Sequence, residues 1–157
     1  MAARHWLLKS EPGAYSIDDL EGDGSTPWTG VRNYQARNLM RDEMAEGDLA
    51  LFYHSSTTPP GVVGIARIAS AGYPDPTASD PDSLGYDEKH TEQDPRWFVV
   101  DVAFVAKLPR TVTLEEIKAE PALTGMVLTR RSRLSVQPVS AAEFATIRRM
   151  AKEAAAG

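Results

Sequence analysis

Hydrophobic and polar residues alternate most regularly over residues 96–108. One set of alternate positions is almost wholly apolar and comprises Phe98, Val100, Val102, Phe104 and Ala106. A period of two is typical of a β-strand, because successive side chains point to opposite faces of the sheet. The pattern therefore predicts a strand over residues 96–108.

Other apolar runs predict further strands. Residues 49–54 are apolar on both faces until His54, as expected of a central strand that is covered on both sides. Residues 61–69 are rich in β-branched side chains but contain Gly64, which predicts a bulge or a bend. Shorter apolar runs predict brief strands at 4–8, 126–128 and 134–136.

Three helix starts share one local signal, a hydroxyl residue followed three positions later by an acidic one. The pairs are Ser16 with Asp19, Thr113 with Glu116, and Ser140 with Glu143. This capping-box spacing predicts a single turn after residue 16, a helix to about residue 119 and a terminal helix to about residue 152. A helical period also runs from residue 33 to about 44, and Gly47 and Asp48 follow it.

Most neighbouring predicted strands are joined by links too short or irregular to be regular crossover helices. This order favours a mixed α/β (α+β) fold with a bent, mostly antiparallel sheet or small barrel and peripheral helices. No repeat, long linker or low-complexity run marks a boundary, so we expect one domain over residues 1–157 with a core of about 5–150. Residues 72–95 hold four prolines and seven acidic side chains and are expected to form a long loop.

Composition narrows the function classes. The 157-residue chain has no cysteine, which excludes disulfides, thiol nucleophiles and iron–sulfur clusters. Only three consecutive large apolar residues precede Lys9, too few for a signal sequence or a membrane span, so we expect a cytoplasmic protein with no membrane partner. The net charge of −5 argues against binding nucleic acid by phosphate attraction alone.

Recognisable catalytic motifs are missing, so we expect no enzyme, no catalytic residue and no cofactor. Only three histidines are present, and His90 falls in the acidic loop, where we expect it to be solvated rather than a metal ligand. His54 lies next to Ser55, but adjacent strand residues point to opposite faces, which argues against a Ser–His catalytic pair.

Residues 28–38 concentrate aromatic, guanidinium, amide and phenol groups at a predicted helix start. An indole can stack on a flat base, an asparagine amide can pair with a base edge, and an arginine can reach a carbonyl or phosphate. An equally open interpretation makes Trp28 and Tyr34 core or lid residues and gives Arg32 a salt bridge.

Five ordered blocks of this chain resemble the EVE domain family. They are residues 6–12 (WLLKSEP), 28–38 (WTGVRNYQARN), 47–55 with Gly47, Asp48 and the run FYHS, 61–66 (GVVGIA) and 132–138 (SRLSVQP). The resemblance runs from about residue 5 to 150. One departure is Thr29, which stands where the family often has an acidic residue.

The resemblance implies a PUA-like bent β-barrel related to readers such as YTH and SRA domains. It further implies a non-enzymatic partner of DNA or RNA that carries a modified base, with modified cytosine as the leading candidate. By position, Trp28 would stack on the base, Ser10 and Asn33 would bond its edge, and Arg32 and Arg133 would contact oxygens. The full expected ligand-binding set is Lys9, Ser10, Glu11, Trp28, Arg32, Asn33, Tyr34, Arg37, Asn38, Tyr53, His54, Ser55, Arg133 and Ser135.

Several points stay open at this stage. Lys9 could contact a phosphate, and Glu11 could equally pair with Arg32. A small enzyme acting on a nucleotide would use His54, Ser55 or Glu11 for proton transfer, and a module for structured RNA would recognise shape and single-stranded loops. A monomer is expected, although the sequence does not determine the oligomeric state.

Overall fold

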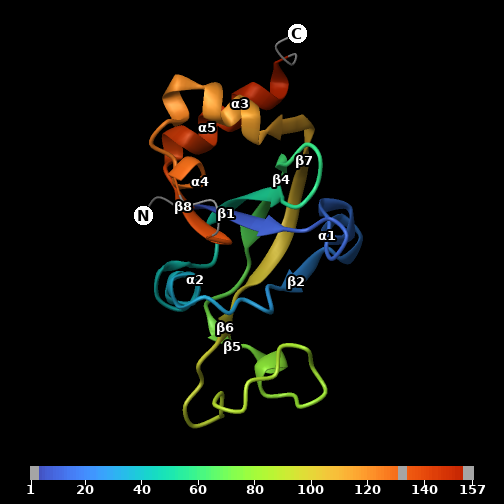
Figure 1. The fold of residues 1–157 in the computed structure, drawn as a ribbon, viewed down its shortest axis with the longest axis vertical. Coiled ribbons are helices and arrows are strands. Elements are labelled where there is room, and N and C mark those ends of the chain that lie inside the picture. Colours follow the sequence, from blue (N-terminus) through green and yellow to red (C-terminus); the bar gives the residue numbers. More distant parts are fainter. Residues whose placement is uncertain (1–3, 131–133, 154–157) are drawn as a thin grey trace.

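One six-stranded sheet forms the centre of the protein (Figure 1). The computed structural model describes residues 4–130 and 134–153. The strands are β1 (His5–Ser10), β2 (Ser25–Pro27), β3 (Leu49–His54), β4 (Gly61–Ile68), β7 (Asp101–Thr113) and β8 (Val136–Val139), in the order β2-β7-β4-β3-β1-β8. Only β1 and β3 pair in parallel among the described strands of this sheet. The sheet curls into an open half-barrel, which confirms the predicted bent, mostly antiparallel α+β fold.

β3 lies in the interior of the sheet, as predicted. It pairs with β1 on one side and with β4 on the other. Ala50 and Phe52 belong to one hydrophobic core, whereas Leu51 and Tyr53 belong to a second core on the opposite face. The continuous apolar run therefore reflects burial of both faces of the strand.

Gly64 is where β4 bends, as predicted. The pairing register shifts between Val62 and Gly64. A Cβ atom at Gly64 would lie 2.5 Å from Ile17 Cδ1 and 2.9 Å from Ala106 O. Glycine at this position lets the first helix pack directly on the strand.

The predicted strand over residues 96–108 is divided between two sheets. Phe98–Val99 form β6, which pairs with β5 (Tyr73–Pro74) in a separate two-stranded ribbon. The carbonyl of Val100, between β6 and β7, accepts a hydrogen bond from the backbone N–H of Trp28 at 2.9 Å. β7 then continues past the predicted end as far as Thr113. The alternation identified the strand residues but not the change of partner.

All three predicted capping boxes are present. They open α1 (Ile17–Asp23), α3 (Leu114–Ala119) and α5 (Ala141–Lys152). The predicted helix near residues 33–44 consists of α2 (Tyr34–Asn38) followed by the π-helical turn η1 (Leu39–Glu43). α1 and α2 lie beside the sheet, and α3 and α5 lie at the opposite end of the molecule from the loop that follows β5 (Figure 1).

Two local predictions need correction, and one short strand was not predicted. Residues 126–128 are not a strand, because Val127–Arg130 form the helix α4, whose first turn is closed by bonds from Thr129 to the Met126 carbonyl. The strand expected at 134–136 begins only at Val136. Ser25–Pro27 form β2, a short strand that the hydrophobic pattern did not predict.

The segment between β5 and β6 is mainly loop, as predicted, and it contains the short helix η2 (Pro76–Ala78). Another short helix, η3 (Pro121–Leu123), follows α3. His90 is not solvated: it is 5% exposed, and its Nδ1 accepts from the backbone N–H groups of Arg96 and Trp97. Within the described residues, no helix is long and apolar enough to cross a membrane.

Candidate functional site

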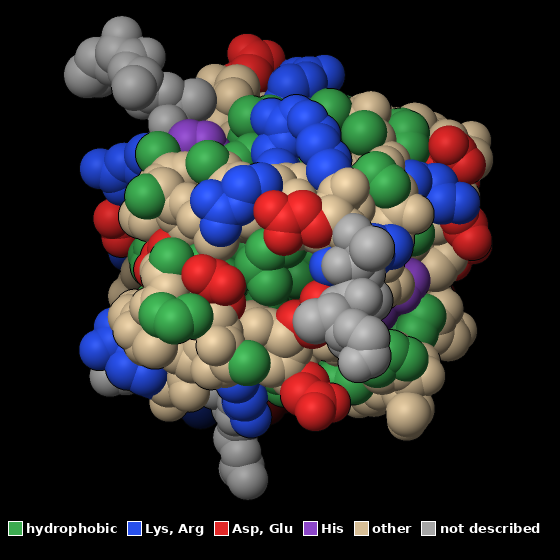
Figure 2. All heavy atoms as spheres, turned by 90° about the horizontal axis from the view of Figure 1, so that it is seen from above, with side chains coloured by type: hydrophobic (Ala, Val, Ile, Leu, Met, Phe, Trp, Pro, Cys, Tyr) green, Lys and Arg blue, Asp and Glu red, His purple; other side chains and the backbone are tan. Residues whose placement is uncertain are grey.

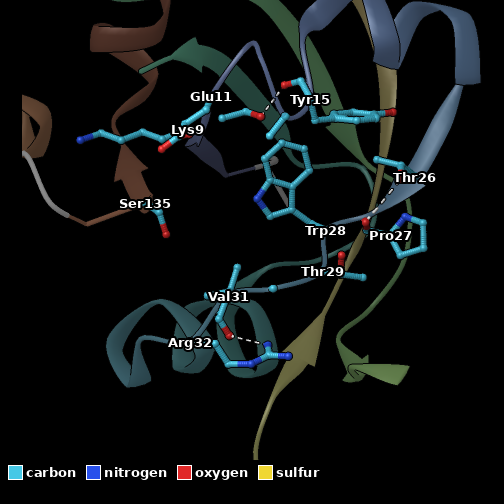
Figure 3. A pocket seen from close by; sticks show the side chains of 13 residues that line it. Lys9, Glu11, Tyr15, Thr26, Pro27, Trp28, Thr29, Val31, Arg32 and Ser135 are labelled. Carbon is cyan, nitrogen blue, oxygen red and sulfur yellow. Dashed lines mark hydrogen bonds between the residues drawn. The ribbon is translucent and has the colours of Figure 1, made fainter. Parts of the chain in front are cut away.

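A cavity of about 490 Å³ opens where the end of β1 meets the segment after β2 (Figure 3). Its wall contains six of the residues predicted from the sequence: Lys9, Ser10, Glu11, Trp28, Arg32 and Ser135. We call it the Trp28 cavity. Its volume falls within the range of about 300–1,000 Å³ that is typical of small-ligand sites. The structure thus gathers residues from three distant parts of the chain around one hollow.

Seven further residues of the wall were not among the predicted site residues: Ala14, Tyr15, Thr26, Pro27, Thr29, Gly30 and Val31. Three of these, Thr29, Gly30 and Val31, lie inside the sequence block that carries the family resemblance. Tyr15 had no such signal, because its position depends on the turn after β1, in which its N–H donates to the Glu11 carbonyl.

Trp28 forms one wall of the cavity and is largely enclosed. The rings of Tyr15 and Phe52 meet its indole at 85°, with centroid distances of 6.3 and 5.6 Å. Edge-to-face packing of this kind fixes the orientation of the ring. Only 9% of the residue is exposed, so a ligand can reach only part of the indole. Trp28 thus belongs to the core, as one interpretation has it, and its stacking on a base stays a prediction, although the ring borders the cavity.

Arg32 is held by a buried acid rather than by Glu11. Its Nη1 donates to Asp75 Oδ2 and to the Val31 carbonyl, each at 3.0 Å. Its Nη2 donates to the Gly85 carbonyl at 2.7 Å. These bonds tie the cavity wall to the loop after β5, so the guanidinium acts mainly as a structural link.

Asp75 holds two residues of the cavity wall, Gly30 and Arg32, in place. Its carboxylate is fully buried and accepts from the Gly30 N–H, where a backbone φ of +83° requires glycine. Burial alone would raise the pKa of Asp75, but hydrogen bonds from Thr77, Gly30 and Arg32 outweigh it and lower the pKa. The ionised form therefore holds the turn at Gly30 in place.

The end of β1 supplies the polar side of the cavity. The Ser10 hydroxyl donates to the Tyr15 carbonyl, and the backbone N–H of Lys9 donates to the Ser135 carbonyl at 2.9 Å. The Lys9 ammonium lies 5.6 Å from the Tyr53 ring, and burial lowers the pKa of Lys9. In Figure 3 the Lys9 side chain points away from Trp28, toward the outside of the cavity.

Four predicted residues on α2 and its cap do not line the Trp28 cavity. Asn33 caps α2 by accepting from the Ala36 N–H at 3.0 Å. Tyr34 stacks on Trp97 at 4.9 Å, and Arg37 lies over Tyr34 and donates to the Arg96 carbonyl. The remaining residue, Asn38, accepts from Arg37. These contacts attach α2 to the start of β6, a distant segment that sequence spacing could not reveal.

Three further predicted site residues, at the end of β3 and just after it, do not line the Trp28 cavity either. Tyr53 faces the second core and is 3% exposed. His54 points to the other face of β3, where its Nε2 accepts from the Ile17 N–H at 3.1 Å, and burial lowers its pKa. Ser55 donates its backbone N–H to the Ser10 carbonyl. Arg133 lies outside the described residues.

Charge is mixed over the face seen from the end that carries α3 and α5 (Figure 2). Several Lys and Arg side chains gather in the upper centre of this view, and Asp and Glu side chains lie around and below them. No group of three or more His, Cys, Asp or Glu residues that could hold a metal ion occurs within residues 4–130 and 134–153.

Residues 4–150 match the profile of the EVE domain. Thymocyte nuclear protein 1 of Gallus gallus is 42% identical over 159 residues, covering 89% of this chain and 65% of that protein. The chain therefore spans slightly less than two thirds of that relative's length.

Solved structures agree with this match. A hypothetical protein from Leishmania major is 50% identical, with a TM-score of 0.92 and 96% coverage of both chains. Human THYN1 protein, crystallised in complex with 5-methylcytosine-containing DNA, is 38% identical, with a TM-score of 0.90 and coverage of 97% of this chain and 99% of that one. These similarities confirm the resemblance found in the sequence, and the chain belongs to the EVE domain family.

Proposed function

We propose that this chain binds DNA or RNA that carries a modified cytosine and holds the modified base in the Trp28 cavity. The observation that carries the proposal is the similarity to human THYN1 protein, whose crystal structure is a complex with 5-methylcytosine-containing DNA. The two chains share 38% identity over nearly their whole lengths. The nucleic-acid partner of the whole protein is likewise part of this proposal.

The chemistry of the cavity supports a flat, partly polar ligand. Trp28, Tyr15 and Val31 offer aromatic and apolar surface, whereas Ser135 and Glu11 offer polar groups. A base inside a duplex must leave the stack to enter such a cavity, which costs a few kcal/mol and less in a single strand. Contact of the base with an aromatic ring stabilises the complex by about 1–3 kcal/mol. Binding should therefore be stronger when the base is already unpaired.

Binding without chemical conversion of the base is part of the proposal. The ionisable groups of the cavity wall are Lys9, Glu11, Tyr15 and Arg32. Burial and the neighbouring Asp23 raise the pKa of Tyr15 to about 12, which makes it a poor proton donor or acceptor at neutral pH. Arg32 is engaged by Asp75. Incubation with modified nucleosides tests this point, because formation of any product would contradict it.

The direct test compares affinities for oligonucleotides that contain one 5-methylcytosine or one cytosine at the same position, as DNA and as RNA. We expect wild type to prefer the methylated form. Trp28→Ala should lower affinity for it by about 5- to 150-fold, the equivalent of losing one aromatic contact of about 1–3 kcal/mol.

Two further variants distinguish a loss of binding from a loss of folding. Trp28 is largely buried, so its truncation also costs about 3–5 kcal/mol of stability. Ser135→Phe leaves the core ring in place and fills the cavity, so it should also abolish the preference. Tyr86→Ala removes an aromatic residue that is 46% exposed and outside the cavity, and should have no effect. Normal binding by a folded Ser135→Phe variant would exclude this cavity as the site.

A further inference from the structure

The three tryptophans of this chain differ in how their indole N–H groups are satisfied. Trp6 Nε1 donates to Asp48 Oδ2 at 2.9 Å, and Trp97 Nε1 donates to Asp87 Oδ2 at 2.8 Å. Trp28 Nε1 has no hydrogen-bond partner within residues 4–130 and 134–153, although the residue is only 9% exposed. The buried side-chain polar atoms that lack a partner, among the described residues, do not include Trp28 Nε1, so this nitrogen is open to the cavity rather than sealed in the core. The indole N–H of Trp28 is thus an accessible donor that no described residue accepts from.

This donor is directed into the cavity. In Figure 3 the indole nitrogen lies on the side of the ring that faces Ser135, with open space between them. Neither Tyr15 nor Phe52 stacks in parallel on a face of the indole, since both rings meet it at 85°. A ligand in the cavity can therefore accept a hydrogen bond from Trp28 as well as touch its ring.

The same wall carries a carboxylate that is weakly engaged. Glu11 is exposed, and its Oε1 accepts from the Ser56 hydroxyl at the long distance of 3.4 Å. Arg32, the partner considered for Glu11 from the sequence, is bound to Asp75 instead. The wall of the cavity therefore includes an N–H donor on Trp28 and a strong acceptor on Glu11.

We propose that these two groups read the pairing edge of cytosine. Trp28 Nε1–H donates to ring N3 or to O2, and Glu11 accepts from the exocyclic amine, a pairing that carboxylates make with cytosine. The inference rests on the proposed function and goes beyond it by naming the groups that select the base. Thymine carries the same 5-methyl group but presents a carbonyl where cytosine has its amine, so it would face the Glu11 carboxylate with an acceptor.

Thymine is therefore the matched probe, because it differs from 5-methylcytosine only along the pairing edge. In single-stranded oligonucleotides we expect 5-methylcytosine to bind about tenfold or more tightly than thymine at the same position, the value of one hydrogen bond to a charged group. Glu11→Gln should narrow this ratio, because an amide can also donate to the thymine carbonyl. Glu92→Gln, which removes the same charge at an exposed position of the loop between β5 and β6, should not change it.

The Trp28 donor is tested separately by the ¹⁵N–¹H resonances of the three indoles. On addition of the 5-methylcytosine oligonucleotide, the Trp28 indole proton should move downfield and exchange more slowly with water. Those of Trp6 and Trp97, already bonded to carboxylates, should stay in place.

The outcomes separate the two proposals. Equal affinity for 5-methylcytosine and thymine, or an unmoved Trp28 indole in the bound state, would overturn the edge-reading inference while leaving the proposed function intact. If Glu11→Gln left the ratio of the affinities for 5-methylcytosine and thymine unchanged, Glu11 would have no part in reading the edge. Failure of wild type to bind 5-methylcytosine in either DNA or RNA would overturn the proposed function and this inference with it.

Discussion

Replacing Asp75 with asparagine tests whether the ion pair beneath the Trp28 cavity holds its wall in place. The buried carboxylate accepts from the Gly30 N–H, from Arg32 Nη1, and from both the N–H and the hydroxyl of Thr77. Asp75→Asn keeps the shape of the side chain but removes its charge and turns one acceptor into a donor. At least one of these four donors then loses its partner.

The expected loss follows from the burial of the pair. Removing one member of a buried ion pair costs about 3–5 kcal/mol. The Asp75 side chain is 0% exposed, but that of Arg32 is 27% exposed, so water partly compensates the unpaired guanidinium. We therefore expect Asp75→Asn to lower the free energy of unfolding by about 3 kcal/mol, near the lower end of this range. For a domain of this size it corresponds to a fall in Tm of about 6–12 °C.

The pH dependence of the loss has a defined sign. Because the folded-state pKa of Asp75 is lowered, the unfolded chain binds more protons between the two pKa values. The stabilisation by Asp75 is complete above the ordinary pKa of about 3.9 and is lost as the pH falls through the lowered value. The difference in stability between wild type and Asp75→Asn should therefore narrow below about pH 4.

Urea denaturation at pH 7 and at acidic pH measures both effects. Asp82→Asn is the matched control, because Asp82 is an exposed acid of the same loop. It should change the free energy of unfolding by less than about 0.5 kcal/mol. An equally small change in Asp75→Asn would refute the anchoring role, and a loss that did not vary with pH would refute its attribution to the carboxylate charge.

Three other substitutions test separate parts of the account. Lys9→Gln should weaken binding of the methylated oligonucleotide and reduce the slope of log affinity against log salt by about 0.7–0.9, and an unchanged slope would mean that Lys9 contacts no phosphate. Burial lowers the pKa of His54, so the unfolded chain binds the extra proton first, and stability should decline as the pH falls from about 6.5 through the lowered pKa. His54→Gln should flatten that decline in urea titrations, and equal slopes would argue against His54 as its source. Gly64→Ala places a Cβ 2.5 Å from Ile17 Cδ1 and should cost about 1–3 kcal/mol in thermal unfolding, whereas an unchanged Tm would show that α1 moves freely.

Features that depend on short-range contacts could be predicted from the sequence. Each capping box joins residues only three positions apart, so Ser16, Thr113 and Ser140 identified their helices correctly. The run at β3 identified a central strand, because burial of both faces leaves a continuous apolar pattern. The strand predicted at residues 126–128 was wrong, because a three-residue apolar run is too short to show a period that distinguishes a strand from a helix.

The candidate site was predicted only in part, because its geometry depends on distant pairings. Sequence blocks brought Ser10, Trp28 and Ser135 together correctly. They could not show that Arg32 pairs with Asp75, 43 positions away, or that Tyr34 stacks on Trp97. A residue type therefore indicated what a side chain can do, whereas the fold decided whether it does so toward a ligand or toward the protein itself.

A backbone amide chemical-shift titration with an oligonucleotide containing one 5-methylcytosine tests most directly whether the base occupies the Trp28 cavity. The account predicts saturable shifts at Ser10, at residues 28–31 and at Ser135, with much smaller ones for the unmethylated oligonucleotide. Saturable shifts confined to α2 or to residues 84–88, with the amides of the cavity unmoved, would contradict it.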